Sequence, residues 1–405
     1  MNLAQPLTFM LRPFLTAAFA ASSLAAADWP QFRGPESAGT VADANIPAKP
    51  KIDWTAPLPG RGLASPIIIG GKVFVTCSSG PAQERLRVIC FSTDDGKKLW
   101  ERQLQATGRT MAHPKTSIAA CTPCSDGKSI FALWSSNDMA AFDLDGGLLW
   151  VRGLTADYPN ASNSLGMASS PIVIGGTVVT QIENDSESYA LGIDTKTGRN
   201  LWKLDRPKAA NWCSPVSWKG VAILQSSKGL LGVNPETGST LWDYAEGAST
   251  TSSSVVSGGV IYAPSNGITA LVPKSNGEPP EQVWRAKQIN PATISPIVLG
   301  DRIFAINSAG VIATADIKTG TSGWKLRLAG AFSGSPVGSG KTLVALNEKG
   351  LLQIVDTAGP EGAVLASLQL PLKKEPEELV LSTPALSGGK IFVRADSALW
   401  RIGGE

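Results

Sequence analysis

Short apolar runs separated by glycine-containing turns recur along the chain and predict β-hairpins. One phrase consists of Ser or Thr, then Pro, a short apolar run, a glycine turn and a second apolar run, as at residues 65–75. Two apolar runs joined by such a turn are typical of a hairpin, and no 3.6-residue period indicates helices. The eight copies begin at Ser65, Thr122, Ser170, Ser214, Ser254, Ser295, Ser335 and Thr383, and the copy at Ser254 lacks the Pro.

A second phrase, Asp-x-x-Thr-Gly followed by Leu-Trp, comes after most of these copies. It is clearest at residues 194–202, with variants at 234–242 and 316–324. The Asp or Asn and the Thr bond the local backbone, and Gly adopts the positive φ of a tight turn. We expect the Trp side chains to pack between repeats rather than to bind a ligand, because aromatic burial dominates cores. These structural tryptophans are Trp54, Trp100, Trp150, Trp202, Trp242, Trp284 and Trp324.

The tryptophans recur about every 45 residues, which is the length of four short strands. We therefore predict an all-β fold, an eight-bladed β-propeller of four-stranded antiparallel blades. An apolar segment at 52–55 precedes the first phrase, and the last phrase leaves room for only three strands. The N-terminal strand should complete the last blade and so close the ring without an open sheet edge. Residues 364–370 should supply the outer strand of the seventh blade.

The first 27 residues have the pattern of an export signal. Arg12 is followed by a short apolar run, and Ala25-Ala26-Ala27 matches a small-residue cleavage site. The run contains Pro13 and is shorter than the ~20 apolar residues that span a bilayer. We expect a signal peptide at 1–27, an N-terminal extension at 28–50 and a single propeller domain at 51–405. The protein should be periplasmic or secreted, with no membrane span.

The repeats resemble the pyrroloquinoline-quinone-like (PQQ-like) propeller family. The segment at 28–35, DWPQFRGP, is similar to the opening of a group of exported bacterial PQQ-like propellers. The same group tends to carry Gly-Arg-Gly and His-Pro-Lys segments, which are matched here at 60–62 and 113–115. The resemblance extends distantly to quinoprotein dehydrogenases and to the outer-membrane barrel-assembly lipoprotein. It implies the propeller fold, but a fold alone assigns no activity.

Resemblance to quinoprotein dehydrogenases would imply bound PQQ, a Ca²⁺ site of carboxylate and amide oxygens, a catalytic Asp and often an adjacent Cys pair. The sequence has no adjacent Cys pair, and no Asp, Asn or Glu cluster has the loop spacing of a Ca²⁺ site. We therefore predict an exported non-enzymatic scaffold for protein or ligand binding, with no catalytic residue, no metal site and no cofactor. The alternative is a PQQ-dependent dehydrogenase, or a degenerate relative, using PQQ with Ca²⁺.

Cysteine and histidine add little chemistry. Cys121 and Cys124 form a C-x-x-C, but Ser125 stands where haem attachment requires His. Their place in the repeat predicts two buried small residues, or a local disulfide in an oxidising compartment. His113 is the single His of the chain, which excludes a multi-His zinc site. The net charge of +3 is spread over alternating signs with no basic stripe, so nucleic-acid binding is not expected.

The loops that lead from each outer strand to the next inner strand should lie together around the mouth of the central channel, where ligand pockets are favoured. Arg61, Lys115 and His113 would make the mouth positive, and Trp212 would provide a flat apolar wall. The expected partner is an envelope or extracellular protein, or a small anionic ligand. The alternative, that these are solvated loop residues or strand caps, stays open. The predicted mouth residues are Arg61, His113, Lys115, Asn163, Asn211, Trp212, Thr250 and Asn290.

Overall fold

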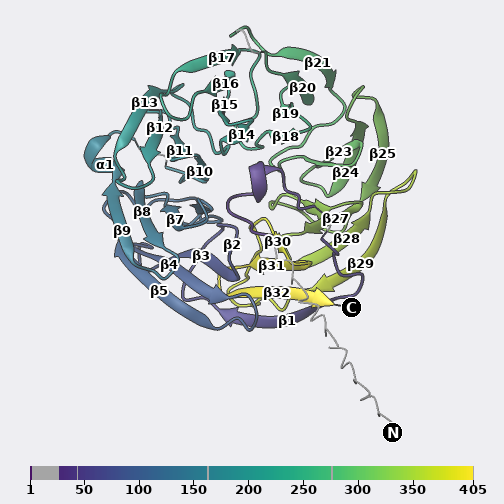
Figure 1. The fold of residues 1–405 in the computed structure, drawn as a ribbon, viewed down its shortest axis with the longest axis horizontal. Coiled ribbons are helices and arrows are strands. Elements are labelled where there is room, and N and C mark those ends of the chain that lie inside the picture. The colour runs from purple at the N-terminus through teal and green to yellow at the C-terminus, as the bar shows by residue number, and fades with distance from the viewer. Residues whose placement is uncertain (2–26, 43, 162–163, 275–276, 405) are drawn as a thin grey trace.

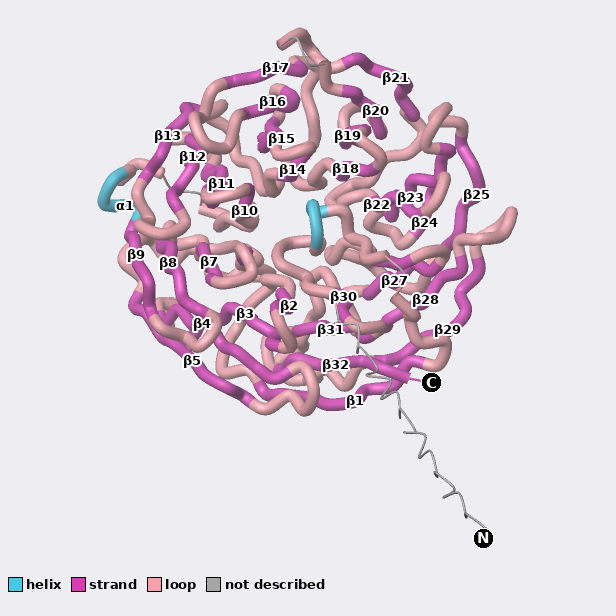
Figure 2. Tube along the Cα trace, in the orientation of Figure 1, coloured by secondary structure: helices cyan, strands magenta, loops and turns pink. Residues whose placement is uncertain are grey.

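Eight four-stranded antiparallel sheets are arranged as the blades of a closed ring (Figure 1). This computed structural model describes residues 1, 27–42, 44–161, 164–274 and 277–404. Figure 2 shows how little of this part of the chain is helical. It contains only a 3-10 turn, η1 (Pro35–Ser37), and a four-residue helix, α1 (Leu154–Asp157). The predicted eight-bladed propeller is confirmed.

Each blade runs from an inner strand of two or three residues to a longer outer strand. Blades 1 to 4 contain β2 (Ile67–Ile69), β3 (Lys72–Ser79), β4 (Arg85–Ser92), β5 (Lys98–Gln105); β6 (Cys124–Ser125), β7 (Ser129–Leu133), β8 (Asp138–Asp143), β9 (Leu148–Gly153); β10 (Ile172–Ile174), β11 (Thr177–Ile182), β12 (Tyr189–Asp194), β13 (Asn200–Asp205); β14 (Val216–Trp218), β15 (Val221–Ser226), β16 (Gly229–Val233) and β17 (Thr240–Tyr244). Blades 5 to 8 contain β18 (Val255–Ser257), β19 (Val260–Pro264), β20 (Ile268–Val272), β21 (Glu281–Ala286); β22 (Ile297–Leu299), β23 (Arg302–Ile306), β24 (Val311–Asp316), β25 (Ser322–Arg327); β26 (Val337–Ser339), β27 (Thr342–Leu346), β28 (Leu351–Asp356), β29 (Ala363–Gln369); β30 (Ala385–Ser387), β31 (Lys390–Arg394), β32 (Ala398–Gly404) and β1 (Pro50–Pro57).

Burial explains the two kinds of strand pattern in the sequence. The middle strands are covered on both faces by neighbouring blades, and in β7 every residue after Ser129 is apolar and buried. Strands covered on both faces have near-continuous apolar sequences. The outer strands alternate, as in β13, where Trp202 faces inward and its neighbours Leu201 and Lys203 face solvent. The hydrophobic core is therefore a ring of inter-blade layers.

Blade 8 is built from both ends of the described chain, as Figure 1 shows where β1 and β32 lie side by side. The pairing is antiparallel and runs from Pro50 opposite Gly404 to Pro57 opposite Ala398. Without β1, the outer edge of β32 would have no partner strand. The predicted closure of the ring by the N-terminal strand is thus confirmed, and β29 is the predicted outer strand of blade 7.

Six of the seven repeated tryptophans, all but Trp242, pack on a glycine of a turn in the next blade. Trp150 of β9 donates its indole N–H to the carbonyl of Thr195 at 2.9 Å. Its ring covers Gly198, which has a φ of 70° and whose added Cβ would lie 2.7 Å from the indole. A side chain at this Gly would both strain the turn and displace the Trp. The inter-blade contact therefore joins successive copies of the second phrase, the Trp of one copy packing on the Gly turn of the next.

The segment before β1 fills one end of the central channel. Trp29 is fully buried and exchanges two backbone hydrogen bonds with Ile68 of β2, at 2.8 and 2.9 Å. Further along, Gly39 accepts a hydrogen bond from the backbone N–H of Gly338 in β26. Between these two points, η1 lies near the centre of the ring and contacts β14 and β18 (Figure 1). Residues 28–41, called the plug below, thus connect the inner strands of several blades.

Arg33 anchors the plug in the channel, and among the described residues it has no acidic partner. Its side chain is fully buried, and its guanidinium donates to the main-chain carbonyls of Pro296, Ser254 and Ala38. Burial lowers the pKa of Arg33 to about 9. Gly34 follows with a φ of 69°, and the ring of Trp29 would collide with any Cβ there. The Arg-Gly pair of the DWPQFRGP segment therefore has a structural role in packing the plug.

Candidate functional site

A ring of eight hydroxyl side chains surrounds the propeller axis, one from each blade. In each blade the backbone N–H of this residue donates to the hydroxyl oxygen of the corresponding residue in the next blade, at 2.9–3.1 Å. The last bond, from Thr383 to Ser65, joins blade 8 to blade 1, so the ring is complete. We call this set the hydroxyl ring. Its members are Ser65, Thr122, Ser170, Ser214, Ser253, Ser295, Ser335 and Thr383.

The hydroxyl ring corresponds to the residue before Pro in the repeated phrase, with one correction. In blade 5 the hydroxyl ring uses Ser253, and Ser254 occupies the position that Pro has in the other copies. The predicted start at Ser254 is therefore shifted by one residue. Aligning the repeat copies by their apolar runs does not reveal this shift, because Ser253 and Ser254 are both small polar residues. A hydroxyl donor to the axis is thus present even in the copy without Pro.

Removing one hydroxyl should destabilise the fold measurably. Ser214→Ala leaves the backbone N–H of Ser170 without its acceptor, and both positions are buried. We expect a loss of about 1–3 kcal/mol in the free energy of unfolding, measured by urea denaturation. Ser214→Thr keeps the oxygen, as Thr does at two other positions of the hydroxyl ring, and should retain most of the stability. Equal stability of the Ala and Thr variants would show that these bonds contribute nothing.

The hydroxyl ring forms the wall of a central cavity of about 420 Å³. All eight hydroxyl-ring residues line it, and Phe32 of the plug also lines it, so the plug limits its depth. Apolar side chains from the mouth loops complete the lining, together with Trp212. Trp212 donates its indole N–H to the carbonyl of Gly166 at 2.8 Å, which fixes the ring. The further apolar lining residues are Leu63, Ala120, Leu165, Ala168 and Leu381.

The loop between blades 1 and 2 carries His113 and Lys115 to the mouth of this cavity. Lys115 bonds both carboxylate oxygens of Glu348 from blade 7, at 2.8 and 2.9 Å, and the hydroxyl of Ser333 donates to the same carboxylate. Burial raises the pKa of Glu348, but the hydrogen bonds from Lys115 and Ser333 outweigh it and lower the pKa overall. The Nδ1 of His113 accepts the backbone N–H of Lys115 at 3.1 Å. The positive charge of Lys115 is therefore already paired.

The other predicted mouth residues are spread over different environments. Arg61 forms an ion pair with Asp396 at 3.3 Å and donates to the carbonyl of Pro114, in a smaller cleft beside the cavity. Thr250 accepts the backbone N–H of Trp212 at 2.8 Å, and its neighbour Thr251 is the residue that lines the cavity. Asn163 lies outside the described residues. Of the predicted set, the structure brings His113, Lys115 and Trp212 together at the central cavity.

Asn211 is buried beneath the mouth instead of lining it. Its amide donates to the Glu183 carboxylate at 3.0 Å and to the carbonyl of Gln225 at 2.7 Å. Glu183 also accepts a 2.6 Å hydrogen bond from Arg206, and both side chains of this ion pair are buried. Burial raises the pKa of Glu183, and the contacts with Arg206 and Asn211 partly oppose this increase. Asn211 therefore belongs to a buried polar network that supports the loop.

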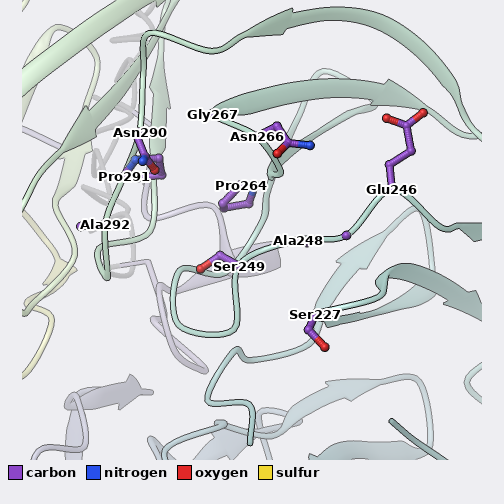
Figure 3. A pocket seen from close by; sticks show the side chains of 11 residues that line it. Ser227, Glu246, Ala248, Ser249, Pro264, Asn266, Gly267, Asn290, Pro291 and Ala292 are labelled. Atoms are coloured by element: carbon purple, nitrogen blue, oxygen red, sulfur yellow. The ribbon is translucent and has the colours of Figure 1, made fainter. Parts of the chain in front are cut away.

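Asn290 lines a separate cleft between blades 4, 5 and 6, of about 390 Å³ (Figure 3). Asn266 and Glu246 also line this cleft. The Glu246 carboxylate accepts a hydrogen bond from Arg285, and this bond lowers the pKa of Glu246. None of the residues that line this cleft also lines the central cavity, so the two are separate, and the charge of Glu246 is already paired.

Two parts of the central site were not predicted from the sequence. Phe32 lies in the DWPQFRGP segment, which indicated the family resemblance, but it was not among the predicted mouth residues. The hydroxyl ring was visible in the sequence as the Ser or Thr before Pro in seven of the repeated phrases. That regularity was a usable signal, because one polar residue per blade at a fixed register must face the axis.

The C-x-x-C thiols are buried. Cys121 and Cys124 are both free and fully inaccessible to solvent, as are the other three cysteines. Burial raises the pKa of Cys121 to about 12 and also raises that of Cys124 well above its ordinary value. Since the thiolate is the reactive form, these two thiols should be unreactive in the folded protein. The sequence had left two interpretations of this pair open, two buried small residues or a local disulfide, and the structure has the first.

Replacing both thiols should affect stability alone. The Cys121→Ser/Cys124→Ser variant buries two hydroxyls where the wild type has weakly polar sulfur, and we expect a loss of about 1–3 kcal/mol. Ligand or partner binding should be unchanged once the variant is folded. Thiol–disulfide exchange with a model disulfide, present in the wild type and lost in the variant, would contradict this assignment.

Within the described ranges, no group of three or more His, Cys, Asp or Glu side chains is placed to hold a metal ion. The described residues that line the central cavity include no Asp, Glu or Asn. Hydroxyl groups and apolar surface thus dominate the site, and its cation is neutralised by Glu348.

The comparisons with known proteins agree with this architecture. The family model described as outer membrane protein assembly factor BamB matches residues 47–188 and 164–325. The outer membrane protein assembly factor BamB of Moranella endobia (strain PCIT) is 23% identical over 186 residues, which are 44% of this chain and 43% of that protein. The match therefore spans less than half of that relative.

Solved structures share the fold at low sequence identity. BamB from Moraxella catarrhalis superposes with a TM-score of 0.64 and 13% identity, covering 88% of this chain and 98% of that one. The quinohemoprotein alcohol dehydrogenase from Comamonas testosteroni gives 0.67 and 13%, covering 93% and 81%, and a europium-containing methanol dehydrogenase gives 0.66 and 12%, covering 93% and 98%. These likenesses show the fold alone. Because the family model matches well over half of the sequence, the chain belongs to the family described as outer membrane protein assembly factor BamB.

Proposed function

We propose that this protein is a non-enzymatic binding scaffold of the cell envelope, which engages a partner at the face that carries the mouth of the central cavity. The observation that supports this most is the cavity itself. Every blade contributes to it, and its polar side chains are mainly hydroxyls, with the His113 imidazole, the Trp212 indole N–H and the Lys115–Glu348 ion pair at the mouth. Convergent loops on a rigid ring are a common place for binding sites. The relatives named as assembly factors make a protein of the envelope the favoured partner.

The location is also a proposal. Residues 1–27 would be an export signal, 28–50 an extension that contains the plug, and 51–405 the propeller of a periplasmic or secreted protein. The signal-peptide pattern and the family of envelope proteins support it. Across residues 27–404, leaving aside the short gaps, no helix has the length and apolar character needed to cross a bilayer.

The second candidate function is PQQ-dependent dehydrogenation, which the quinoprotein structural neighbours suggest. PQQ is a tricarboxylate and its quinone is activated by a cation held by oxygen ligands. The described residues of the central cavity fit it poorly, because Lys115 is already paired with Glu348 and carboxylate or amide ligands are lacking. The repeated tryptophans are committed to inter-blade packing. The residues present therefore do not fit the cofactor.

Two experiments test the proposal. The protein is incubated with PQQ and Ca²⁺ and then desalted, and the expected result is no retained quinone absorbance. Stoichiometric retention would favour the dehydrogenase. In parallel, envelope proteins that co-purify with the wild type are compared with those of Leu165→Glu, on the exposed mouth side, and Leu201→Glu, on the exposed outer rim. The proposal expects Leu165→Glu to lose the partner and Leu201→Glu to keep it, and the opposite pattern would refute it.

A further inference from the structure

We propose that the central cavity binds one uncharged small molecule with an apolar body and a hydrogen-bond acceptor, such as a ketone, ester or amide. This inference rests on the proposed function, since it specifies the ligand chemistry of the same face. It also replaces the anionic ligand expected from Arg61, His113 and Lys115. The volume of about 420 Å³ lies within the range of small-molecule pockets.

The hydroxyl ring supplies hydrogen-bond donors to this cavity. Each of its oxygens already accepts a backbone N–H from the preceding blade, at 2.9–3.1 Å. A hydroxyl that accepts still carries one proton to donate. The eight side chains are buried and line the cavity. The Ser170 hydroxyl already donates to the carbonyl of Ala168 at 3.5 Å, so the remaining hydroxyls are the donors held in place before a ligand arrives. A ligand with a carbonyl oxygen would match them, and fixed donors reduce the entropy lost on binding.

The rest of the lining favours an apolar ligand body. Phe32 closes the inner end, Leu63 and Leu381 lie on the wall, and Trp212 is held by its bond to Gly166. When an apolar ligand contacts these walls, apolar surface of both the ligand and the cavity is removed from water. This burial provides the main favourable free energy of binding. The combination of apolar walls with a belt of hydroxyl donors thus selects an amphipathic neutral molecule.

Charge discriminates against an anion. Lys115 is the described lining residue with a full positive charge, and both oxygens of Glu348 bond it. Arg61, in the adjoining cleft, is paired with Asp396. A carboxylate entering the cavity would lose its hydration and meet Lys115 together with Glu348, so the net attraction is small.

Two isosteric fluorescent probes test the inference on the intact protein. One is 2-acetyl-6-dimethylaminonaphthalene, which is neutral and has a carbonyl acceptor, and the other is 6-dimethylamino-2-naphthoate, in which a carboxylate replaces the acetyl group. We expect one neutral probe to bind per protein, with emission shifted to shorter wavelength than in water. The carboxylate should bind at least about tenfold more weakly. Equal or tighter binding of the carboxylate would overturn the inference, as would the absence of saturable binding of the neutral probe.

Three variants locate the bound probe. Ala168→Phe reduces the free volume of the cavity and should weaken neutral-probe binding by about tenfold or more, whereas Ala292→Phe, in the separate cleft of Figure 3, should not. Glu348→Gln frees Lys115 and should raise the affinity for the carboxylate towards that of the neutral probe, which itself should change little. Unchanged carboxylate affinity in Glu348→Gln would contradict the charge argument. If the wild type does not bind the neutral probe but keeps its envelope partner, only this inference is defeated. If the wild type binds the probe but has no envelope partner, only the partner proposal is defeated.

Discussion

Deletion of residues 28–60 should abolish the cooperative thermal unfolding of the protein. The deletion removes β1, so β32 loses its partner along the whole register from Ala398 to Gly404. It also removes the plug with Trp29, and it exposes the side of blade 8 that contains Trp400, which is 1% accessible in the intact ring. An unpaired edge with apolar faces is prone to aggregation. Calorimetry or circular dichroism should show a broad or absent transition, together with aggregates in light scattering.

A rearranged chain provides the control for this deletion. Pro50 lies opposite Gly404, so residues 50–60 can be appended after Gly404 through a two-residue hairpin turn. This variant has β1 in place but lacks the plug. We expect it to regain a cooperative transition at a lower temperature than the wild type. If the simple deletion melts like the intact protein, the ring does not depend on closure by β1.

The Arg206→Met variant should lose about 3–5 kcal/mol of unfolding free energy near neutral pH. It leaves the Glu183 carboxylate, which is 1% accessible, with only the amide of Asn211 as a donor at 3.0 Å. An unpaired charge in a buried site is much more costly than a buried neutral pair of similar shape. Chemical denaturation of wild type and variant measures the difference, and the double variant Arg206→Met/Glu183→Gln should recover most of it.

The pH dependence of this variant has a defined sign. Burial already raises the pKa of Glu183 above its ordinary value, and loss of the Arg206 charge should raise it further. A carboxyl whose pKa is higher in the folded than in the unfolded state binds its proton more tightly when folded, so stability falls as pH rises between the two values. The deficit of Arg206→Met should therefore be small near pH 4.5 and should grow towards pH 7.5. A deficit that does not change with pH would contradict this account, because it would mean that the substitution leaves the pKa of Glu183 unchanged.

The sequence predicted the architecture well because the propeller is built from local repeats. The number of blades, the strand of blade 7 without a Trp, and closure by the segment around 52–55 all follow from the spacing of apolar runs and turns. Hairpin pairing joins strands that are neighbours in sequence, except for the closing pair of β1 with β32, which follows from the three strands left for the last blade. Even the packing of Trp150 on Gly198 combines two phrases that are one repeat apart.

The candidate site was predicted less well, because its contacts are long-range. Arg33 bonds carbonyls of Ser254 and Pro296, more than two hundred residues away, and nothing in its local sequence indicates these acceptors. Lys115 seemed a free cation until the structure placed Glu348 of blade 7 beside it. Asn211 has the position of a mouth residue but turns inward to Glu183. The direction of a loop side chain depends on the tertiary partners that it meets, not on its place in the repeat.

Site-directed photo-cross-linking in the envelope tests the central claim, that the mouth face of a non-enzymatic propeller binds the partner. A photoreactive amino acid is placed at exposed positions of the mouth face, Leu165 or Thr293, or at exposed turn positions on the opposite face, Lys97 or Lys219. The account predicts a discrete cross-linked partner from Leu165 and Thr293 and none from Lys97 or Lys219. Cross-links that form only from the opposite face would contradict it.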